Sequence, residues 1–387
     1  MQISKRANNI SASQSLVMAA RCREMRAAGI DVVSMSLGEP DFATPEHIRC
    51  AAKEAVDNHW SHYGPVPGIP SLRDVIAVQQ NGIADNRIAW KGEDVLVSVG
   101  AKMAIYNAIQ TALNPGDEVI IPTPSWVSYS EMVKLAEGKA VLVPTRFEDD
   151  YCLTPDQLRA ALTPRTRMLI LCSPNNPTGA VYSCAQLEAL VAVLRDYPEV
   201  AVLSDEIYAC LTYGAEVLSL AAFPELENRL ILINGVSKAY AMTGYRVGWL
   251  MTKNKAFLAG CVRLQGQQCT CATMVAQKAA ESAISGPQDC VEEMRRVFAG
   301  RRELICRMAS EIPGLRFREP QGAFYLFPDV SAFGTGDEVT ERLLEKAHVA
   351  VVSGSAFGTP ECIRLSYAIS TEEIQEAMKR IKTCLVL

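Results

Sequence analysis

Short apolar runs recur through the middle of the chain, and this recurrence constrains the fold more than any other feature. Each run is rich in Val, Ile and Leu and is separated from the next by a longer stretch with helical patterning. Runs that are apolar almost throughout are typical of strands buried on both faces of a mainly parallel sheet. We therefore expect an α/β fold with helices on both faces of a central sheet. The runs are Val95–Val99, Glu118–Ile121, Ala140–Val143, Met168–Cys172, Val200–Leu203, Leu230–Ile233 and Val247–Met251.

The two ends of the chain have a different pattern. An opening helix is expected at Ser13–Ala28, because a small polar residue begins it and Gly29 is a suitable C-cap. The final third has helical charge patterning from about Pro287 to Ile312, and its last helix begins at Ser370 with a capping box completed by Glu373. Strand-like segments lie between these helices at Ala323–Phe327, Val349–Val352 and Cys362–Tyr367.

These patterns predict two domains in one subunit. A chain of 387 residues is long enough for more than one hydrophobic core. Since the opening helix has no sheet of its own, we expect it to join the C-terminal part. The predicted large domain covers residues 46–285, and a smaller, discontinuous α/β domain combines residues 1–45 with residues 286–387.

Composition and charge exclude several classes of function. A net charge of −5 and a pI near 5.6 argue against a nucleic-acid or anionic-membrane partner, which would need a basic face. No apolar run reaches the roughly 18–20 residues of a membrane span, and the N-terminus has no signal-peptide pattern, so we expect a soluble, cytoplasmic protein. The thirteen cysteines form no CxxC pair and are expected to be free thiols. The four histidines lack helical metal-site spacing, so no metal is expected.

Polar or glycine-bearing residues follow five of the apolar runs. In open α/β sheets, ligands bind just beyond the carboxyl ends of the strands, so these segments should meet at one edge. Together they supply an anion site, an aromatic ring, an amide, a carboxylate and a lysine, which is the inventory of an active site. The segments are Gly100-Ala101-Lys102, Pro122–Trp126, Ser173–Gly179, Ser204–Tyr208 and Asn234–Lys238.

Several motifs, in order along nearly the whole chain, resemble one enzyme family. Ser237–Gly248 is similar to the signature of the class I aminotransferases, and Ser173–Gly179, Asp205–Tyr208 and Ile363–Tyr367 match the same family. The resemblance implies the type I fold of pyridoxal-phosphate-dependent transferases, with pyridoxal 5′-phosphate as the cofactor. It also implies an amino acid and a keto acid as small-molecule partners, and a homodimer with shared active sites.

The resemblance assigns residues to the cofactor ring. Lys238 would carry the cofactor as a Schiff base and then move the proton between substrate and cofactor, which requires a neutral amine. Asp205 would keep the pyridine nitrogen protonated, so that the ring can accept electrons. Tyr208 and Asn176 would hydrogen-bond its 3-oxygen, and Trp126 would stack on the ring.

The resemblance also assigns a cradle for the cofactor phosphate. Gly100-Ala101-Lys102 opens a helix, where free N–H groups and the helix dipole favour an anion. Ser237 and Arg246 would complete the cradle, with Arg246 as a bidentate charge partner. Tyr63 resembles the tyrosine that reaches the phosphate of the neighbouring subunit.

Binding of the substrate α-carboxylate is expected to centre on Arg364. This arginine lies within a strand pattern, where an unpaired buried charge would be costly. The resemblance makes it the clamp for the α-carboxylate and adds a backbone contact from Gly38. It also places Trp126 and Asn176 beside the substrate.

Lys102 is the main indication of substrate choice. Many relatives have Ser or Thr at this position, and a cation in the first turn of a helix costs about 0.3–1 kcal/mol through the helix dipole. In one branch of the aspartate aminotransferases, a lysine at this position is associated with the distal carboxylate of acidic substrates, and Ser13 and Ser15 would assist. We therefore expect an aspartate:2-oxoglutarate aminotransferase that works by a ping-pong exchange, with prephenate or aromatic substrates left open.

Other functions remain as alternatives. The cofactor motifs equally suit a β-lyase acting on sulfur amino acids, or an aminotransferase for aromatic or neutral amino acids. A non-catalytic metabolite sensor is disfavoured, because the chain has no room for a DNA-binding domain before Gly38. A nicotinamide dehydrogenase is disfavoured, because no strand is followed by G-x-G-x-x-G.

Overall fold

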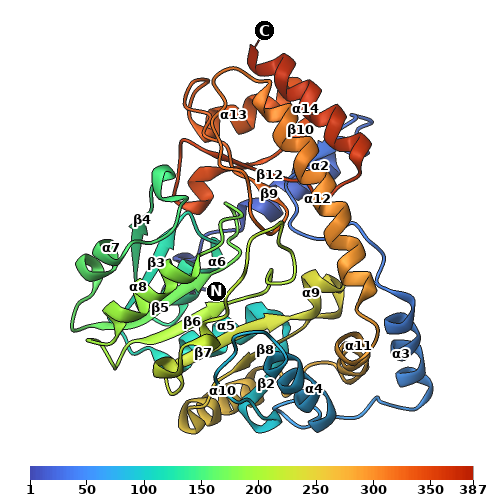
Figure 1. Ribbon diagram of the computed structural model, residues 1–387. Helices are drawn as coiled ribbons and strands as arrows, with labels where there is room; N and C mark the ends of the chain where they lie inside the picture. Colours follow the sequence, from blue (N-terminus) through green and yellow to red (C-terminus); the bar gives the residue numbers. More distant parts are fainter. Residues whose placement is uncertain (387) are drawn as a thin grey trace.

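A seven-stranded sheet forms the centre of the molecule. The structure, a computed structural model, describes residues 1–386. The sheet has the order β2-β8-β7-β6-β5-β3-β4, and its strands are parallel except β8, which runs antiparallel to β2 and β7 (Figure 1). Its strands confirm the seven predicted runs, with no end displaced by more than two residues. They are β2 Val95–Val99, β3 Glu118–Thr123, β4 Lys139–Pro144, β5 Thr166–Cys172, β6 Ala201–Asp205, β7 Leu230–Gly235 and β8 Val247–Met251.

Both faces of this sheet are buried, which explains why the runs are apolar throughout. Successive side chains of a strand point to opposite faces. In β7, Leu230 and Leu232 belong to one hydrophobic cluster, whereas Ile231 and Ile233 belong to another. The helices α4, α8 and α11 contribute to the first cluster, and α5, α6 and α10 contribute to the second. The expected arrangement of helices on both faces is confirmed.

The helices follow the strands in the alternation that the sequence indicates. The predicted opening helix is α2, with Ser13 as its N-cap, and the predicted helix near Pro287 is α12. The capping box at the last helix is present, since Ser370 and Glu373 exchange hydrogen bonds. The helices are α1 Lys5–Asn8, α2 Gln14–Ala27, α3 Glu46–Asp57, α4 Pro70–Asn81, α5 Gly100–Ala112, α6 Ser128–Leu135, α7 Pro155–Ala161, α8 Cys184–Leu194, α9 Val236–Ala239, α10 Lys255–Gln268, α11 Met274–Ser285, α12 Asp289–Ser310, α13 Gly336–Arg342 and α14 Thr371–Val386.

Segments from both ends of the chain build a second, smaller layer. Strand β1 (Val33–Ser34) pairs in parallel with β10 (Val349–Ala350), although more than three hundred residues separate them. Strands β11 (Val352–Ser353), β12 (Ile363–Ser366) and β9 (Tyr325–Leu326) form an antiparallel sheet. The segment expected as one strand at 349–352 is thus two short strands in different sheets. One hydrophobic cluster joins residues next to β1 with residues of α12, α14 and β9.

The packing supports the predicted two-domain division, which we propose for residues 46–285 against 1–45 and 286–387. Ile48 of α3 belongs to a core of the central sheet, whereas Met35 belongs to the core of the terminal layer. Helix α12 crosses between them, because Cys290 packs on the first core and Phe298 lies in the second. Figure 1 shows this long helix connecting the two parts.

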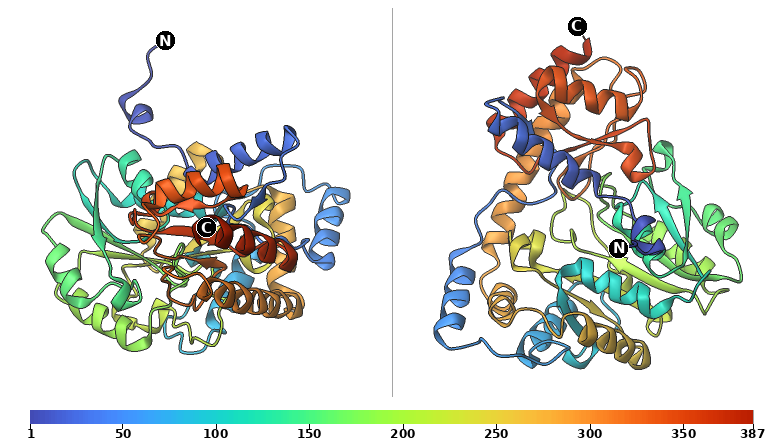
Figure 2. Two further views of the ribbon diagram at one scale, coloured as in Figure 1. Left: turned by 90° about the horizontal axis from the view of Figure 1, so that it is seen from above. Right: turned by 180° about the vertical axis from the view of Figure 1, so that it is seen from behind.

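The N-terminal segment contacts the rest of the molecule mainly through polar side chains at and after α6, with Arg6 4.0 Å from Glu137 and the Ser11 backbone bonded to Glu131. Its first residues project away from the body in the view from above (Figure 2), and α1 contains no buried residue. Among residues 1–386 there is no helix with the length and apolar character needed to cross a bilayer. The same residues contain no group of three or more His, Cys, Asp or Glu side chains arranged for a metal ion.

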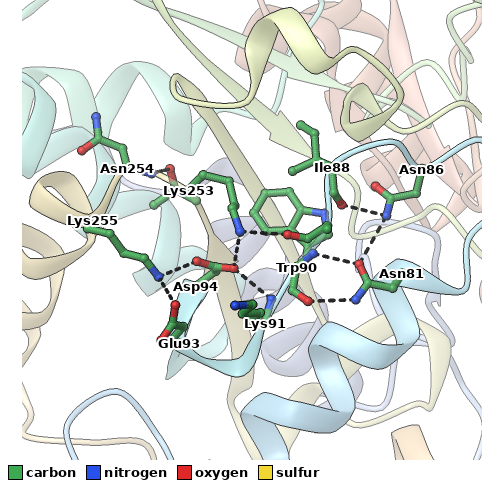
Figure 3. A network of polar contacts seen from close by, with 12 residues as sticks. Asn81, Asn86, Ile88, Trp90, Lys91, Glu93, Asp94, Lys253, Asn254 and Lys255 are labelled. Atoms are coloured by element: carbon green, nitrogen blue, oxygen red, sulfur yellow. Dashed lines mark hydrogen bonds and ion pairs between the residues drawn. The ribbon is translucent and has the colours of Figure 1, made fainter.

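A buried carboxylate ties the start of β2 to the end of β8. Asp94 is fully buried, and it accepts hydrogen bonds from the Lys91 backbone at 2.9 Å, from Lys253 at 2.9 Å and from Lys255 at 2.7 Å (Figure 3). Burial would raise the pKa of Asp94, but the hydrogen bonds from the two lysines outweigh burial and hold that pKa below its ordinary value. Because the folded pKa is lowered, this stabilisation is present at neutral pH and lost as the pH falls through that pKa.

We expect Asp94→Asn to destabilise the protein by about 2–4 kcal/mol, because Lys253 loses the partner that compensates its charge. The measurement is the midpoint of urea unfolding. The control is Glu93→Gln, because Glu93 is exposed and pairs only with Lys255, so its loss should cost at most about 0.5 kcal/mol. Equal midpoints for the two variants would contradict the structural role of Asp94.

Candidate active site

A cavity of about 440 Å³ lies beyond the carboxyl ends of the parallel strands. The five predicted segments converge there: α5 begins at the end of β2, Trp126 follows β3, Asn176 follows β5, Asp205 ends β6 and Lys238 follows β7. The terminal layer closes the opposite side with residues of α2 and β12. Predicted site residues that line the cavity are Ser13, Ser15, Gly38, Ala101, Lys102, Trp126, Asn176, Asp205, Tyr208, Ser237, Lys238, Arg246 and Arg364.

Lys238 lies on the short helix α9 and points into this cavity. Its Nζ donates a hydrogen bond to the Gly38 carbonyl at 2.5 Å and lies 5.9 Å from the centroid of the Phe324 ring. Burial lowers the pKa of Lys238 to about 8. The charge of Glu39 opposes this shift, and the charges of Arg246 and Arg364 add to it. An amine with this pKa is partly neutral at physiological pH, as a nucleophilic lysine requires.

Asp205 ends β6 with its carboxylate buried in the cavity wall. Its side chain accepts a hydrogen bond from the Tyr129 hydroxyl at 2.6 Å and one from the Ile207 backbone at 3.3 Å. Burial raises the pKa of Asp205 to about 6, against these hydrogen bonds and the charge of Lys238. A buried carboxylate without an ion pair is suited to receive a protonated ring nitrogen, which would compensate its charge.

The N-terminus of α5 forms an anion site beside Arg246. Gly100 has φ +79°, and a Cβ at this position would lie 2.5 Å from Nη2 of Arg246, so a larger residue would displace the guanidinium. The first N–H groups of α5 and the helix dipole favour a phosphate here. The side-chain hydroxyl of Ser237, also in the cavity wall, makes no hydrogen bond to residues 1–386 and is free to donate one to the same anion. This cradle fits the phosphate of the predicted cofactor.

Arg364 is buried, with 2% of its surface exposed, and no carboxylate among residues 1–386 forms an ion pair with it. It donates hydrogen bonds to Asn176 Oδ1 at 3.0 Å, to the Ser36 carbonyl at 2.7 Å and to Ser15 Oγ at 3.4 Å. The Nε atom of Arg364 is buried and has no hydrogen-bond acceptor among residues 1–386. Burial lowers the pKa of Arg364, and an anionic ligand would compensate its charge.

Lys102 lies on the rim of the cavity, where its side chain is exposed, whereas Arg364 is buried. Its Nζ lies 4.8 Å from the centroid of the Trp126 ring, and solvent reaches the side chain. Its pKa is lowered by partial burial and by the charge of Arg246. Ser13, the N-cap of α2, lines the same cavity. No carboxylate of the described chain pairs with Lys102, so the rim holds a second uncompensated cation.

Tyr63 is the one predicted site residue that the structure places well outside the cavity. Its side chain is 91% exposed and belongs to a loop that packs on Met274 through Gly64. The hydroxyl therefore cannot reach the anion site of its own subunit from this position. The contact of Tyr63 with the phosphate of a neighbouring subunit stays a prediction.

Three aromatic residues of the cavity were not among the predicted site residues. Tyr129 hydrogen-bonds Asp205 and stands edge-on to Trp126, with ring centroids 5.3 Å apart. Tyr325 and Phe357 lie against Arg364. A signal for Tyr129 was available, because it follows Trp126 by three residues, and the turn that leads into α6 brings the two rings together. No sequence signal distinguished the other two from core aromatics.

Comparison with known proteins agrees with this geometry. Residues 30–381 match the family model described as aminotransferase class I and II. The chain is 42% identical to an aspartate aminotransferase of Bacillus sp. (strain YM-2), with 98% of each chain covered. It is 39% identical to an aspartate/prephenate aminotransferase of Nitrosomonas europaea over the full length of both. The solved structure of Thermus thermophilus aspartate aminotransferase with maleate superimposes with a TM-score of 0.94 at 37% identity, covering all of both chains.

These matches, together with the lysine, carboxylate and anion cradle at the sheet edge, establish the family. The chain belongs to the class I and II aminotransferases, which depend on pyridoxal phosphate.

Proposed function

We propose that this protein transfers the amino group of aspartate to 2-oxoglutarate by a ping-pong mechanism. The observation that carries the substrate assignment is the pair of uncompensated cations, Arg364 within the cavity and Lys102 on its rim. Aspartate, glutamate and their keto acids have two carboxylates, and one cation is available for each. An amino acid with an apolar side chain would leave Lys102 without an anion.

The relatives support the same substrate class. The similar Bacillus protein is named an aspartate aminotransferase, and the Thermus thermophilus enzyme was solved with maleate, which is a dicarboxylate. We propose that Arg364 binds the α-carboxylate through the side of its guanidinium next to Asn176, with Gly38 adjacent. Lys102, with Ser13 and Ser15, would then bind the distal carboxylate.

We propose that Lys238 holds the cofactor and performs the proton transfer. When bound, pyridoxal phosphate supplies an electron sink that stabilises negative charge at the substrate Cα. The incoming amino group takes the place of Lys238, whose neutral amine then accepts the proton from Cα. Burial favours the neutral form of this amine.

The remaining residues would orient the cofactor. Asp205, positioned by Tyr129, would hold the proton on the ring nitrogen, because a carboxylate beside that nitrogen favours its charged form. Tyr208 and Asn176 would bind the 3-oxygen, and Trp126 would stack on the ring. The phosphate would be held by the N-terminus of α5 (Gly100-Ala101-Lys102), Ser237 and Arg246.

We also propose a cytoplasmic homodimer with shared active sites. Tyr63 and Trp60 are exposed aromatic side chains on one loop, and such residues are enriched at protein interfaces. If a second copy covered this loop, Tyr63 would lie close to the anion site of that second copy.

The cysteines support the cytoplasmic location. All thirteen are free thiols, which is typical of a reducing compartment.

Two alternatives arise from the same cavity. Leu16 and Leu37 are exposed at its mouth, and they favour some activity on acids with a ring in the side chain, such as prephenate, since a relative is named an aspartate/prephenate aminotransferase. A β-lyase would use the same cofactor residues. Release of pyruvate and ammonia from cysteine without a keto-acid acceptor would identify it.

Lys102→Ala should lower kcat/KM for aspartate by roughly 10- to 100-fold, because a charge-assisted hydrogen bond is lost. Activity on alanine, which has no distal carboxylate, should change less than about twofold if only that bond is lost. Lys102→Arg, which keeps the charge, serves as the matched control and should retain most of the preference. Steady-state kinetics with both amino acids measure this, and an equal loss on aspartate and alanine would rule out the assignment.

The rate at which pyridoxal phosphate attaches to the apoenzyme should rise with pH and level off above about 8. Only the neutral Lys238 amine attacks the aldehyde, and its fraction increases as the pH passes through the lowered pKa. Stopped-flow absorbance after mixing apoenzyme with cofactor records the rate. A rate that still climbs steeply near pH 10 would mean that Lys238 keeps an ordinary pKa.

Mixing Lys238→Ala subunits with Tyr63→Phe subunits should restore activity if the sites are shared. One site of the mixed dimer then combines a native Lys238 with a native Tyr63 from the other subunit. Activity is measured after the two variants are unfolded and refolded together, with each variant refolded alone as the control. Activity no greater than that of the refolded controls would show that Tyr63 acts within its own subunit or not at all.

A further inference from the structure

We propose that Tyr325 is a positioning residue that orients the hydroxyl of Tyr208 and braces the guanidinium of Arg364. The inference rests on the roles proposed above, in which Tyr208 binds the cofactor 3-oxygen and Arg364 binds the α-carboxylate. Tyr325 is 1% exposed and lies in the cavity wall. It would connect the cofactor side of the site with the substrate side through a single side chain.

Strand pairing brings Tyr325 and Arg364 to the same face. Tyr325 of β9 pairs with Ser366 of β12 in the antiparallel sheet. Because side chains alternate along a strand, Arg364 lies on the same face as Ser366, two residues away. The Arg364 guanidinium therefore lies over the Tyr325 ring, 4.5 Å from its centroid, and Phe357 lies 5.0 Å away.

The hydroxyl of Tyr325 forms a hydrogen bond with the hydroxyl of Tyr208 at 2.9 Å. Burial raises the pKa of both groups, so each keeps its proton at neutral pH. Within residues 1–386 neither hydroxyl has another partner, so the pair holds two protons and one mutual hydrogen bond. One of the two hydroxyl protons therefore has no acceptor among these residues and is available to a ligand.

The direction of this bond follows from the proposed role of Tyr208. If Tyr208 donates its only proton to the 3-oxygen, Tyr325 must donate to the oxygen of Tyr208. A hydrogen bond received at its oxygen makes Tyr208 a stronger donor. The 3-oxygen is then better stabilised as an anion, which lowers the pH at which the bound cofactor changes its absorption.

The Tyr325 ring is held firmly enough to act in this way. Its hydroxyl packs beneath Gly38, where an added Cβ would collide with it. The ring also contacts Phe324 and Tyr208, with centroids 4.8 Å and 5.9 Å away. Ala323, two residues earlier, has φ +58°, and its carbonyl accepts hydrogen bonds from Tyr213 and Tyr367. The backbone that carries Tyr325 is thus fixed from both sides.

The hydroxyl and the ring should have separable effects. Tyr325→Phe removes only the hydroxyl, and we expect the spectral pKa of the holoenzyme to rise by roughly half a unit or more. The dissociation constant of Tyr325→Phe for maleate should stay within about twofold of that of the unchanged protein, because the ring under Arg364 remains. Tyr325→Leu also removes the ring, so it should show the same spectral shift and in addition weaken maleate binding roughly 3-fold or more. Phe357→Leu is the control for the other ring beside Arg364, and it should weaken maleate binding without moving the spectral pKa.

The test combines absorption spectra of the holoenzyme at a series of pH values with calorimetric titration of maleate. A spectral pKa that is unchanged in Tyr325→Phe but raised in Tyr208→Phe would overturn the role of Tyr325 and leave the proposed function intact. No change in Tyr208→Phe would instead remove the role of Tyr208 on which the inference rests. Unchanged maleate binding in Tyr325→Leu would overturn the bracing of Arg364 by Tyr325. A spectral shift in Tyr325→Phe, with an added loss of maleate binding in Tyr325→Leu, would support both roles.

Discussion

The buried charge of Arg364 is the constraint around which the site is organised. No carboxylate of the described chain pairs with it, and only an amide, a backbone carbonyl and a serine hydroxyl share its protons. Such a charge is costly unless an anion arrives to compensate it. The flanking rings of Tyr325 and Phe357 lessen the cost without neutralising the charge. The uncompensated charge of Arg364 therefore favours the binding of a carboxylate at this position.

The central sheet supplies the other half of the site. Its parallel strands end at one edge, so Asp205 and Lys238 reach the same cavity although they come from different strands. Hydrophobic clusters on both faces hold these ends rigid. The same cavity shifts two pKa values in opposite senses, raising that of Asp205 and lowering that of Lys238. Both shifts favour the neutral forms, because burial penalises charge of either sign.

Local patterns in the sequence were sufficient to predict much of the fold and several residues of the site. The apolar runs predict the strands, and residues typical of helix ends predict the opening helix and the capping box at Ser370. The structure confirms these predictions. The positions of Lys238 and Asp205 follow from the rule that ligands bind at strand ends. Tyr325 could not be found in this way, because its contact with Tyr208 joins residues 117 positions apart. Tyr63 poses a different difficulty, since its predicted partner belongs to a second chain.

The most direct test of the account is the visible absorption of the purified holoenzyme during single additions of amino acids. We predict that aspartate removes the absorption of the bound cofactor at far lower concentration than alanine or phenylalanine, and that 2-oxoglutarate restores it. That result would establish both half-reactions and the dicarboxylate preference that Arg364 and Lys102 indicate. A holoenzyme whose absorption responds equally to aspartate and alanine would contradict the assignment of two carboxylates to two cations.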